Sequence, residues 1–291
     1  MNSSPHPQQD MVSVIIPTFN RVHLVERAIN SVLTQTNKNF ELIVVDDGST
    51  DNTLSQLSPK FPQVHWITQQ NSGVSKARNR GIQQARGPWI ALLDSDDVWH
   101  PQKLELQIKF IQKTPSILFC HTDEQWIRNG TKVNPPSYLD KTNHQIFNKS
   151  LDRCIICPSS VLMHKSILEK TGLFNEKLPV CEDYDLWLRL LIGYDIAYLP
   201  QKMVTKYGGH NDQLSSQYWG MDRFRVTALE NLLNQPNLKE NFKKPIIQTL
   251  ILKLDRLAQS FAKHNKLKEA QKFRAKSKSY SLRSQSASIS T

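Results

Sequence analysis

The first hundred residues alternate between short apolar runs and segments whose apolar residues recur at helical spacing. The apolar runs predict buried strands at residues 12–16, 40–45, 64–68 and 89–93. Between them, apolar positions three or four residues apart predict a helix after the first strand and another over 73–85. Alternating strands and helices are typical of an α/β fold with a mostly parallel, doubly wound, Rossmann-like sheet flanked by helices.

The pattern becomes less regular after residue 101. Leu104, Ile108 and Ile111 predict one face of a helix, and 117–121 and 159–163 predict strands. Residues 123–149 are polar and predict a long surface excursion. From Trp219 onward, apolar stripes at helical spacing predict a helical C-terminal appendage, and they include Phe224, Ala228, Leu232, Leu233, Ile247, Leu250, Ile251, Leu254 and Leu257.

Acidic residues follow two of the predicted strands, as Asp46-Asp47 and as three carboxylates within 94–97. Ligands of an open α/β sheet bind beyond the carboxyl ends of its strands, so this edge predicts a nucleotide site. Carboxylates this close raise one another's pKa values unless a cation neutralises them, and carboxylate clusters suit Mg²⁺ or Mn²⁺. The alternative is an ordinary strand end at which Asp97 caps a helix that starts near Pro101.

The positive charge of the chain is concentrated at its C-terminal end. The net charge is +11, and residues 239–291 hold thirteen Lys and Arg against three acids, which gives +10 for that segment. The rest of the chain is nearly neutral, so we expect no nucleic-acid partner for the body that carries the acids. The basic side of the C-terminal helices leaves two interpretations open, a solvated face or one that lies on anionic lipid.

No segment of the sequence approaches the apolar length of a membrane span, and residues 1–10 are polar. We therefore expect a cytoplasmic protein, and lipid contact by the basic helices would place it on the inner face of the membrane. Cys154 and Cys157 have zinc or redox spacing, but no second pair accompanies them, so we expect ordinary buried thiols.

Four motifs in residues 12–100, in this order and at compatible spacings, resemble family 2 glycosyltransferases of the GT-A fold. They are Val14–Arg21, Val44–Asp51, Asn71–Gly81 and Leu93–Asp97. The resemblance is dense over the first third of the chain and continues more loosely to about residue 215. It implies a catalytic domain over 11–215, with a nucleotide-binding half at 11–100 and an acceptor half at 101–215. A helical appendage over 216–280 follows, and 1–10 and 281–291 are expected to be disordered.

The resemblance also implies a donor site for a nucleotide-sugar, expected to be UDP-linked. Asp47 matches a position that holds the base or ribose, Arg78 one that contacts the diphosphate, and Asp96 the ligand of Mn²⁺ or Mg²⁺. His210 is a second candidate for the metal or phosphate. The full set of implied donor contacts is Pro17, Thr18, Asn20, Arg21, Asp47, Arg78, Asp94 and Ser95.

Simpler interpretations remain open for several of these residues. Asp47 would also serve to cap a turn, and Asp46 looks structural. Arg78 would also fit a solvated helix face shared with Lys76 and Arg80, and His210 an ordinary loop position.

Glu182 and Asp183 directly precede a predicted helix. The helix dipole alone explains acids at this position. The resemblance assigns the general base to Asp183 and orientation of the acceptor to Glu182, and direct displacement by an activated hydroxyl inverts the anomeric centre. The chain lacks the Gln-x-x-Arg-Trp element of the processive synthases, which favours transfer of a single sugar.

The expected function is an inverting, metal-dependent glycosyltransferase with a glycan or lipid-linked acceptor in surface polysaccharide synthesis. A nucleotidylyltransferase is one alternative, although it usually has a Gly-rich basic loop where this chain has Pro17–Arg21. A catalytically silent nucleotide-sugar-binding protein is the other. The apolar stripe of the C-terminal helices would pack on the catalytic domain or on a second subunit, so the oligomeric state stays open.

Overall fold

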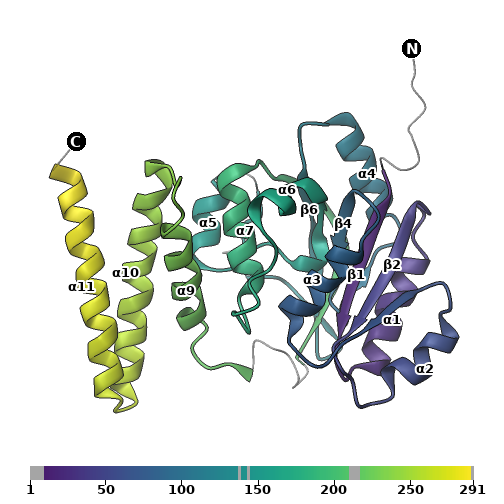
Figure 1. Cartoon of the computed structure of the whole chain (residues 1–291), viewed down its shortest axis with the longest axis horizontal. Coiled ribbons are helices and arrows are strands. Elements are labelled where there is room, and N and C mark those ends of the chain that lie inside the picture. Colours follow the sequence, from purple (N-terminus) through teal and green to yellow (C-terminus); the bar gives the residue numbers. More distant parts are fainter. Residues whose placement is uncertain (1–9, 137–138, 143–144, 210–216, 290–291) are drawn as a thin grey trace. The chain divides into compact units, whose positions relative to one another are not determined.

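A computed structural model describes residues 10–136, 139–142, 145–209 and 217–289 of the chain, with side chains as far as residue 283 (Figure 1). The chain divides into two compact units. Unit 1 comprises residues 1–144, 155–179 and 193–211, and unit 2 comprises 145–154, 180–192 and 212–291. Unit 1 contains the sheet, and unit 2 is helical.

The sheet of unit 1 has the strand order β3-β2-β1-β4-β8-β6-β9-β5, and β7 pairs with β6. The first four strands are mutually parallel, β6 and β9 are parallel, and the other pairs are antiparallel. This arrangement confirms the α/β class predicted from the alternating pattern. The strands are β1 (Val12–Thr18), β2 (Phe40–Asp46), β3 (His65–Thr68), β4 (Trp89–Leu92), β5 (Val98–Trp99), β6 (Phe119–Arg128), β7 (Thr131–Val133), β8 (Val161–His164) and β9 (Ala197–Gly208).

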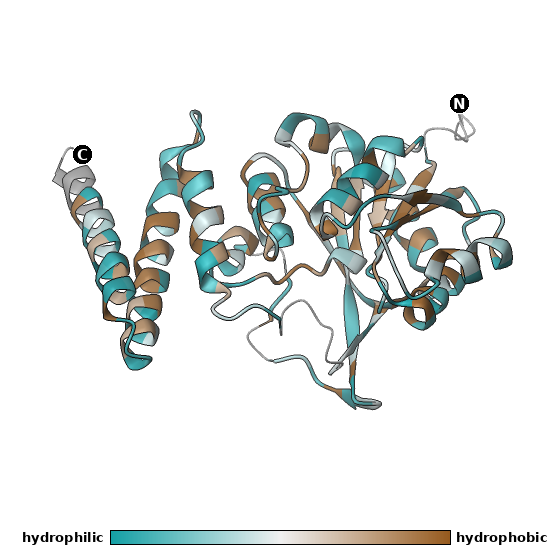
Figure 2. Ribbon diagram, turned by 60° about the horizontal axis from the view of Figure 1, so that its bottom comes forward, coloured by the Kyte–Doolittle hydropathy of each residue, from teal (hydrophilic) through white to brown (hydrophobic). Residues whose placement is uncertain are grey.

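Helices flank this sheet because each has one apolar stripe to bury. Val25, Ala28, Ile29 and Val32 of the first helix lie in the core, against the brown, hydrophobic strands of Figure 2. The helices of unit 1 are α1 (Val22–Leu33), α2 (Thr53–Lys60), α3 (Val74–Gln84), α4 (Lys103–Lys113) and α6 (Lys165–Thr171), with a 3₁₀ turn η1 (Pro158–Ser160).

Helix α3 packs very close to the sheet at Gly81. A Cβ atom at this position would lie 2.5 Å from Cγ2 of Ile15 and 3.3 Å from Cγ2 of Val45. A side chain at this position would collide with Ile15 and Val45, so glycine permits the close approach of α3 to β1 and β2.

The first strand was predicted to end at residue 16, before Pro17, but β1 continues to Thr18. Ile15 accepts a hydrogen bond from Leu93 N, so β1 residues of the same parity face β4. The ladder between β1 and β4 ends at Ile15 and Leu92, and Pro17 therefore lies where no donor is needed.

Residues 123–149 are not one long surface excursion as expected. β6 runs to Arg128 and forms a hairpin with β7 through Asn129 and Gly130, whose φ angles are +49° and +76°. Asn-Gly is a strong hairpin signal, and the polar side chains of β6 obscured it. The predicted strand at 159–163 begins only at Val161, after the 3₁₀ turn.

Unit 2 is built from α5 (Ile146–Asp152), α7 (Glu182–Gly193, its last residue in unit 1), α9 (Asp222–Leu233), α10 (Glu240–Lys263) and α11 (Leu267–Ile289). The predicted apolar stripes are largely buried, with Ala228, Leu232, Leu250, Leu254 and Leu257 all inside. α11 runs past residue 280, at which we expected the appendage to end. Among the described helices, none combines the length and apolar character needed to cross a bilayer.

Candidate active site

The loops that follow β1 and β2 are tied together at the edge of the sheet. Asn20 has a φ of +51°, a conformation that asparagine adopts more readily than most residues. Its backbone N–H donates to Oγ of Ser49 (2.8 Å), and its side-chain oxygen accepts from Thr50 N (2.7 Å). Thr18 ends β1 beside these loops, and its buried hydroxyl has no hydrogen-bond partner in the described part of the chain.

Asp47 is buried and held by the loop after β3. Its carboxylate accepts hydrogen bonds from Nε2 of Gln69 (2.6 Å), Ser72 N (2.9 Å) and Gly73 N (2.8 Å). A carboxylate has about four lone-pair sites, so these bonds orient Asp47 and leave acceptor capacity for one more donor. Asp46 accepts from Ser49 N (2.9 Å), as expected of a structural residue.

Arg78 lies inside the protein and pairs with Asp94. Its Nη2 is 2.7 Å from Oδ1 of Asp94, and its side chain is only 4% exposed. Lys76 and Arg80 on the same helix are exposed, so the alternative of a solvated face is wrong for Arg78. The guanidinium also lies 5.1 Å from the ring centroid of Phe174.

Two arginines near the start of α1 reach the acidic end of β4. Nη1 of Arg21 lies 3.4 Å from Oδ2 of Asp96 and 3.4 Å from Oγ of Ser95. Nη2 of Arg27 donates to the backbone oxygen of Asp96 (2.8 Å). This strand end therefore brings acidic and basic groups together at the edge of the sheet.

The expectation that Asp97 caps the next helix is wrong. The two-residue strand β5 follows Asp97, and α4 begins only at Lys103. The Asp97 carboxylate instead accepts from Oγ of Ser159 (2.6 Å) and from Tyr207 N (3.3 Å), so it joins β4 to η1 and β9. Burial raises its pKa, and the neighbouring carboxylates of Asp96 and Asp94 raise it further.

The donor chemistry of Asp94 and Asp96 fits Mg²⁺ or Mn²⁺, because both offer hard carboxylate oxygens. Among the described residues, no three or more His, Cys, Asp or Glu side chains form a metal centre. Mg²⁺ often takes only one or two protein carboxylates and completes its shell with water and phosphate oxygens. His210 lies outside the described residues.

Three acids occupy the first turn of α7 in unit 2, and each has a different environment. Asp185 forms an ion pair with Arg189 (2.8 Å), and Glu182 is buried. Asp183 is partly exposed, and its Oδ1 accepts from Tyr184 N (2.7 Å). Its Oδ2 lies 3.2 Å from Sγ of Cys154, which donates its S–H.

Several residues of these two sites could not be predicted from the sequence. Cys157 is buried as expected, but Cys154 is only partly buried, and its contact with Asp183 was not foreseen. Arg27 has no local signal, because a lone arginine in a helix is usually solvated. Ser159 and Tyr207 reach Asp97 only through the packing of η1 and β9 beside β4.

Comparison with known proteins identifies the family of the chain. The model of glycosyl transferase family 2 matches residues 13–172, more than half of the chain. WfgD of Escherichia coli, a UDP-Glc:alpha-D-GlcNAc-diphosphoundecaprenol beta-1,3-glucosyltransferase, is 36% identical over 71% of this chain and 80% of its own. TuaG of Bacillus subtilis, named a putative teichuronic acid biosynthesis glycosyltransferase, is 31% identical over 72% of this chain and 83% of its own.

The fold is also similar to that of S. aureus TarS 1-349, solved in complex with UDP-GlcNAc. The TM-score is 0.67 at 19% identity, over 94% of this chain and 92% of that one. This similarity confirms the GT-A fold. The family match and the two relatives confirm the enzyme class expected from the four motifs, and the chain therefore belongs to glycosyl transferase family 2.

Proposed function

We propose that this glycosyltransferase transfers a single sugar, with inversion, from a UDP-sugar to a glycan or lipid-linked acceptor in surface polysaccharide synthesis. One observation carries the proposal: Thr18, Asp47, Arg78, Asp94 and Asp96 gather at the carboxyl ends of the parallel strands or on the helix packed against them. The names of WfgD, with a UDP-linked donor and a lipid-linked acceptor, and of TuaG support the choice of substrates. The proposed catalytic region, residues 11–215, includes segments of both units.

In this proposal the residues at the ends of β1 and β2 bind the nucleoside. The Thr18 hydroxyl is buried and has no partner among the described residues, so it is available to the base or ribose. Asp47 offers its remaining acceptor capacity to a base N–H or a ribose hydroxyl. Pro17 lies near the end of β1 and Asn20 in the loop after it, and the bonds of Asn20 to Ser49 and Thr50 fix that loop before the donor arrives.

The diphosphate would lie at the end of β4. Arg21 and Arg78 supply positive charge there, and Asp96, with Asp94 and Ser95 beside it, would hold the Mn²⁺ or Mg²⁺. When bound, this cation neutralises the charge that develops on the departing diphosphate. The ion pair between Arg78 and Asp94 keeps the guanidinium directed toward the same strand end.

Asp183 is proposed as the general base that takes the proton of the acceptor hydroxyl. It is the partly exposed acid of the three in the first turn of α7, whereas Asp185 is occupied by Arg189. Glu182 is proposed to orient the acceptor. A single base and direct attack by the acceptor give inversion at the anomeric carbon.

The proposal is tested by incubating the full chain with a panel of nucleotide-sugars and Mn²⁺ and measuring release of the nucleotide. We expect slow hydrolysis of one UDP-sugar and protection of the protein by UDP in a thermal melt. A ligand at 100 times its dissociation constant adds about 2.7 kcal/mol to the free energy of unfolding. Protection without any turnover, in the presence of candidate acceptors, would favour a silent binding protein. Release from GDP- or CMP-sugars alone would contradict the UDP assignment.

We further propose that the basic face at the α10–α11 turn lies on anionic lipid, where a lipid-linked acceptor is found. Lys263, Lys266, Lys268 and Lys272 are exposed there, and Leu267 beside them is 62% exposed. Vesicles with anionic lipid should bind the protein, and binding should fall steeply with salt, since exposed charges are screened within about 10 Å at 0.1 M. Replacing the four lysines by glutamine should abolish binding and spare donor hydrolysis. If this variant binds vesicles as tightly as the wild type, the basic face is simply solvated.

A further inference from the structure

The carboxylate of Asp183 is positioned from the segment that follows α5. Cys154, two residues beyond the end of α5, donates its S–H to Oδ2 of Asp183 at 3.2 Å. The adjacent Tyr184 is buried, and its hydroxyl donates to the backbone oxygen of Leu151 in α5 (2.6 Å). The first turn of α7 is thus fastened twice to the C-terminal end of α5.

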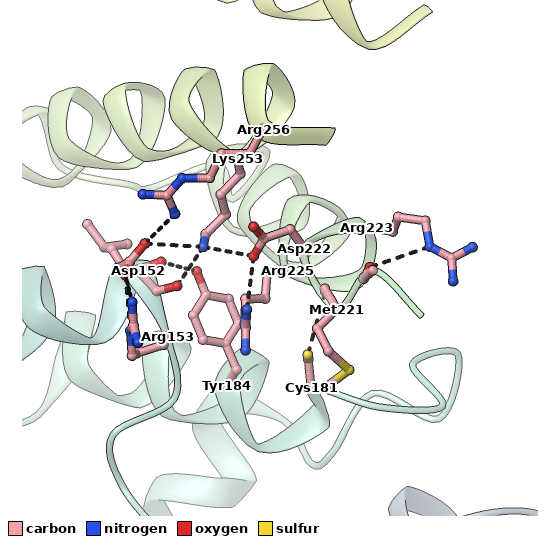
Figure 3. Close-up of polar contacts among 12 residues, drawn as sticks. Asp152, Arg153, Cys181, Tyr184, Met221, Asp222, Arg223, Arg225, Lys253 and Arg256 are labelled. Atoms are coloured by element: carbon pink, nitrogen blue, oxygen red, sulfur yellow. Dashed lines mark hydrogen bonds and ion pairs between the residues drawn. The ribbon is translucent and has the colours of Figure 1, made fainter. Parts of the chain in front are cut away.

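That end of α5 is in turn fastened to α10 (Figure 3). Nζ of Lys253 donates to the backbone oxygen of Asp152 (2.5 Å) and lies 3.7 Å from Oδ1 of its carboxylate. Nη1 of Arg256, one turn further along α10, lies 3.0 Å from the same Oδ1. Despite partial burial, these cations and Arg153 lower the pKa of Asp152 to about 2.

Lys253 stands at the centre of this cluster and also reaches α9. Its side chain is 1% exposed, and Nζ lies 3.1 Å from Oδ1 of Asp222 in the first turn of α9. Oδ1 of Asp222 also pairs with Nη1 of Arg225 (2.9 Å). The ammonium therefore lies between a helix C-terminus and an acid at a helix N-terminus, as the helix dipoles favour.

Stability alone does not account for such a cluster. Taking charged groups out of water costs several kcal/mol per ion, and well-packed apolar residues often stabilise a protein as well or better. A buried ion cluster does, however, fix how the helices are oriented, because each of its hydrogen bonds requires a set distance and angle. Here the directed contacts run from α10 to α5 and from α5 to the proposed base.

We propose that Lys253 is a positioning residue for catalysis, which holds the end of α5 so that Cys154 and Tyr184 set the orientation of the Asp183 carboxylate. This inference rests on the proposed role of Asp183 as general base. It makes α10 part of the catalytic apparatus, although no group of α10 is assigned to touch substrate.

The contact nearest the base gives the sharpest variants. Cys154→Ala removes the donor, and Cys154→Ser keeps one. We expect Cys154→Ala to lower kcat about tenfold with KM for the donor unchanged, since small misplacements of a reacting group cost rate and not affinity. Cys154→Ser should retain most of the activity. In an Asp183→Asn background, Cys154→Ala should have no further effect, because the two residues act as a unit.

The distant contact is tested by the paired variant Lys253→Met/Asp222→Asn, which removes one charge of each sign. We expect the same loss of kcat at constant KM. Lys276→Met is the matched control, because Lys276 also forms an interhelical ion pair in unit 2, with Glu230 at 2.7 Å. It should leave kcat unchanged. If the paired variant does not fold, Arg256→Met removes the partly exposed arm of the cluster and should lower kcat in the same direction.

Several outcomes would overturn the inference. Wild-type kcat in Cys154→Ala, or an equal loss in the wild-type and Asp183→Asn backgrounds, would show that the contact does not act through the base. An equal loss of kcat in Lys276→Met would show that the cluster serves only the fold of unit 2. If Asp183→Asn itself turns over like the wild type, the base assignment fails, and this outcome is distinct from failure of the positioning role.

Discussion

Replacement of Asp183 by asparagine is expected to lower kcat by about 10²–10⁴-fold while the affinity for the nucleotide-sugar stays the same. Asparagine is nearly isosteric but cannot take a proton. Its single oxygen can still accept from Tyr184 N, and its NH₂ group then faces the Cys154 sulfur, which is a weak acceptor. The loss should therefore come from chemistry and not from folding. Steady-state kinetics with a saturating acceptor, together with calorimetric titration of UDP, would measure the two quantities.

Asp195→Asn is the matched control for this prediction. Asp195 is an exposed aspartate just beyond the end of α7, so the same substitution there should change neither quantity. Turnover by Asp183→Asn at the wild-type rate would place the base elsewhere. Glu182, its neighbour in the same helical turn, would then be the next residue to replace.

Replacement of Asp96 by alanine is expected to abolish the metal-dependent part of donor binding. Replacing a residue that only supports a metal ligand typically lowers metal affinity about 10–100-fold. Replacing a direct ligand should therefore lower the affinity for the metal by more than about 100-fold. The substitution also releases Arg21, whose Nη1 lies 3.4 Å from the lost carboxylate. UDP affinity should be measured with and without Mn²⁺ in the wild type and the variant.

Measuring UDP affinity with and without Mn²⁺ distinguishes the loss of a metal ligand from a change in the local charge. The wild type should bind UDP more tightly with Mn²⁺, and Asp96→Ala should bind it equally with or without the ion. Asp255→Ala, which removes an exposed aspartate of α10, should behave like the wild type. An unchanged Mn²⁺ effect in Asp96→Ala would remove Asp96 from the proposed metal site.

The elements of the first hundred residues could be predicted because burial and periodicity coincide there. β1, β2 and β4 are buried along their whole length or nearly so, and the stripe of α1 is their partner. The second half was harder because β6 carries polar side chains such as Asp123 and Glu124 while its backbone pairs with β9 along almost its whole length. Backbone pairing alone does not produce the alternation of apolar and polar residues by which a strand is predicted.

The sequence motifs indicated the candidate residues of the site, but not the hydrogen bonds that these residues make. The acids and Arg78 stand in local motifs that a single sequence displays. Their partners come from distant segments, as when Asp97 accepts from Ser159 and Tyr207, 62 and 110 positions away. The contact between Cys154 and Asp183 is of the same kind, since it depends on the packing of α5 against α7.

Unit 2 is assembled from three stretches of chain, and the bond from Lys253 to Asp152 spans 101 positions. Closing a loop of this length lowers the entropy of the chain before the contact can stabilise it, so contacts of this kind slow folding. During synthesis, α5 and α7 leave the ribosome well before α10 exists to hold them. A nascent chain that already carries every proposed donor-site and base residue should therefore transfer sugar more slowly until α10 has emerged and holds the end of α5.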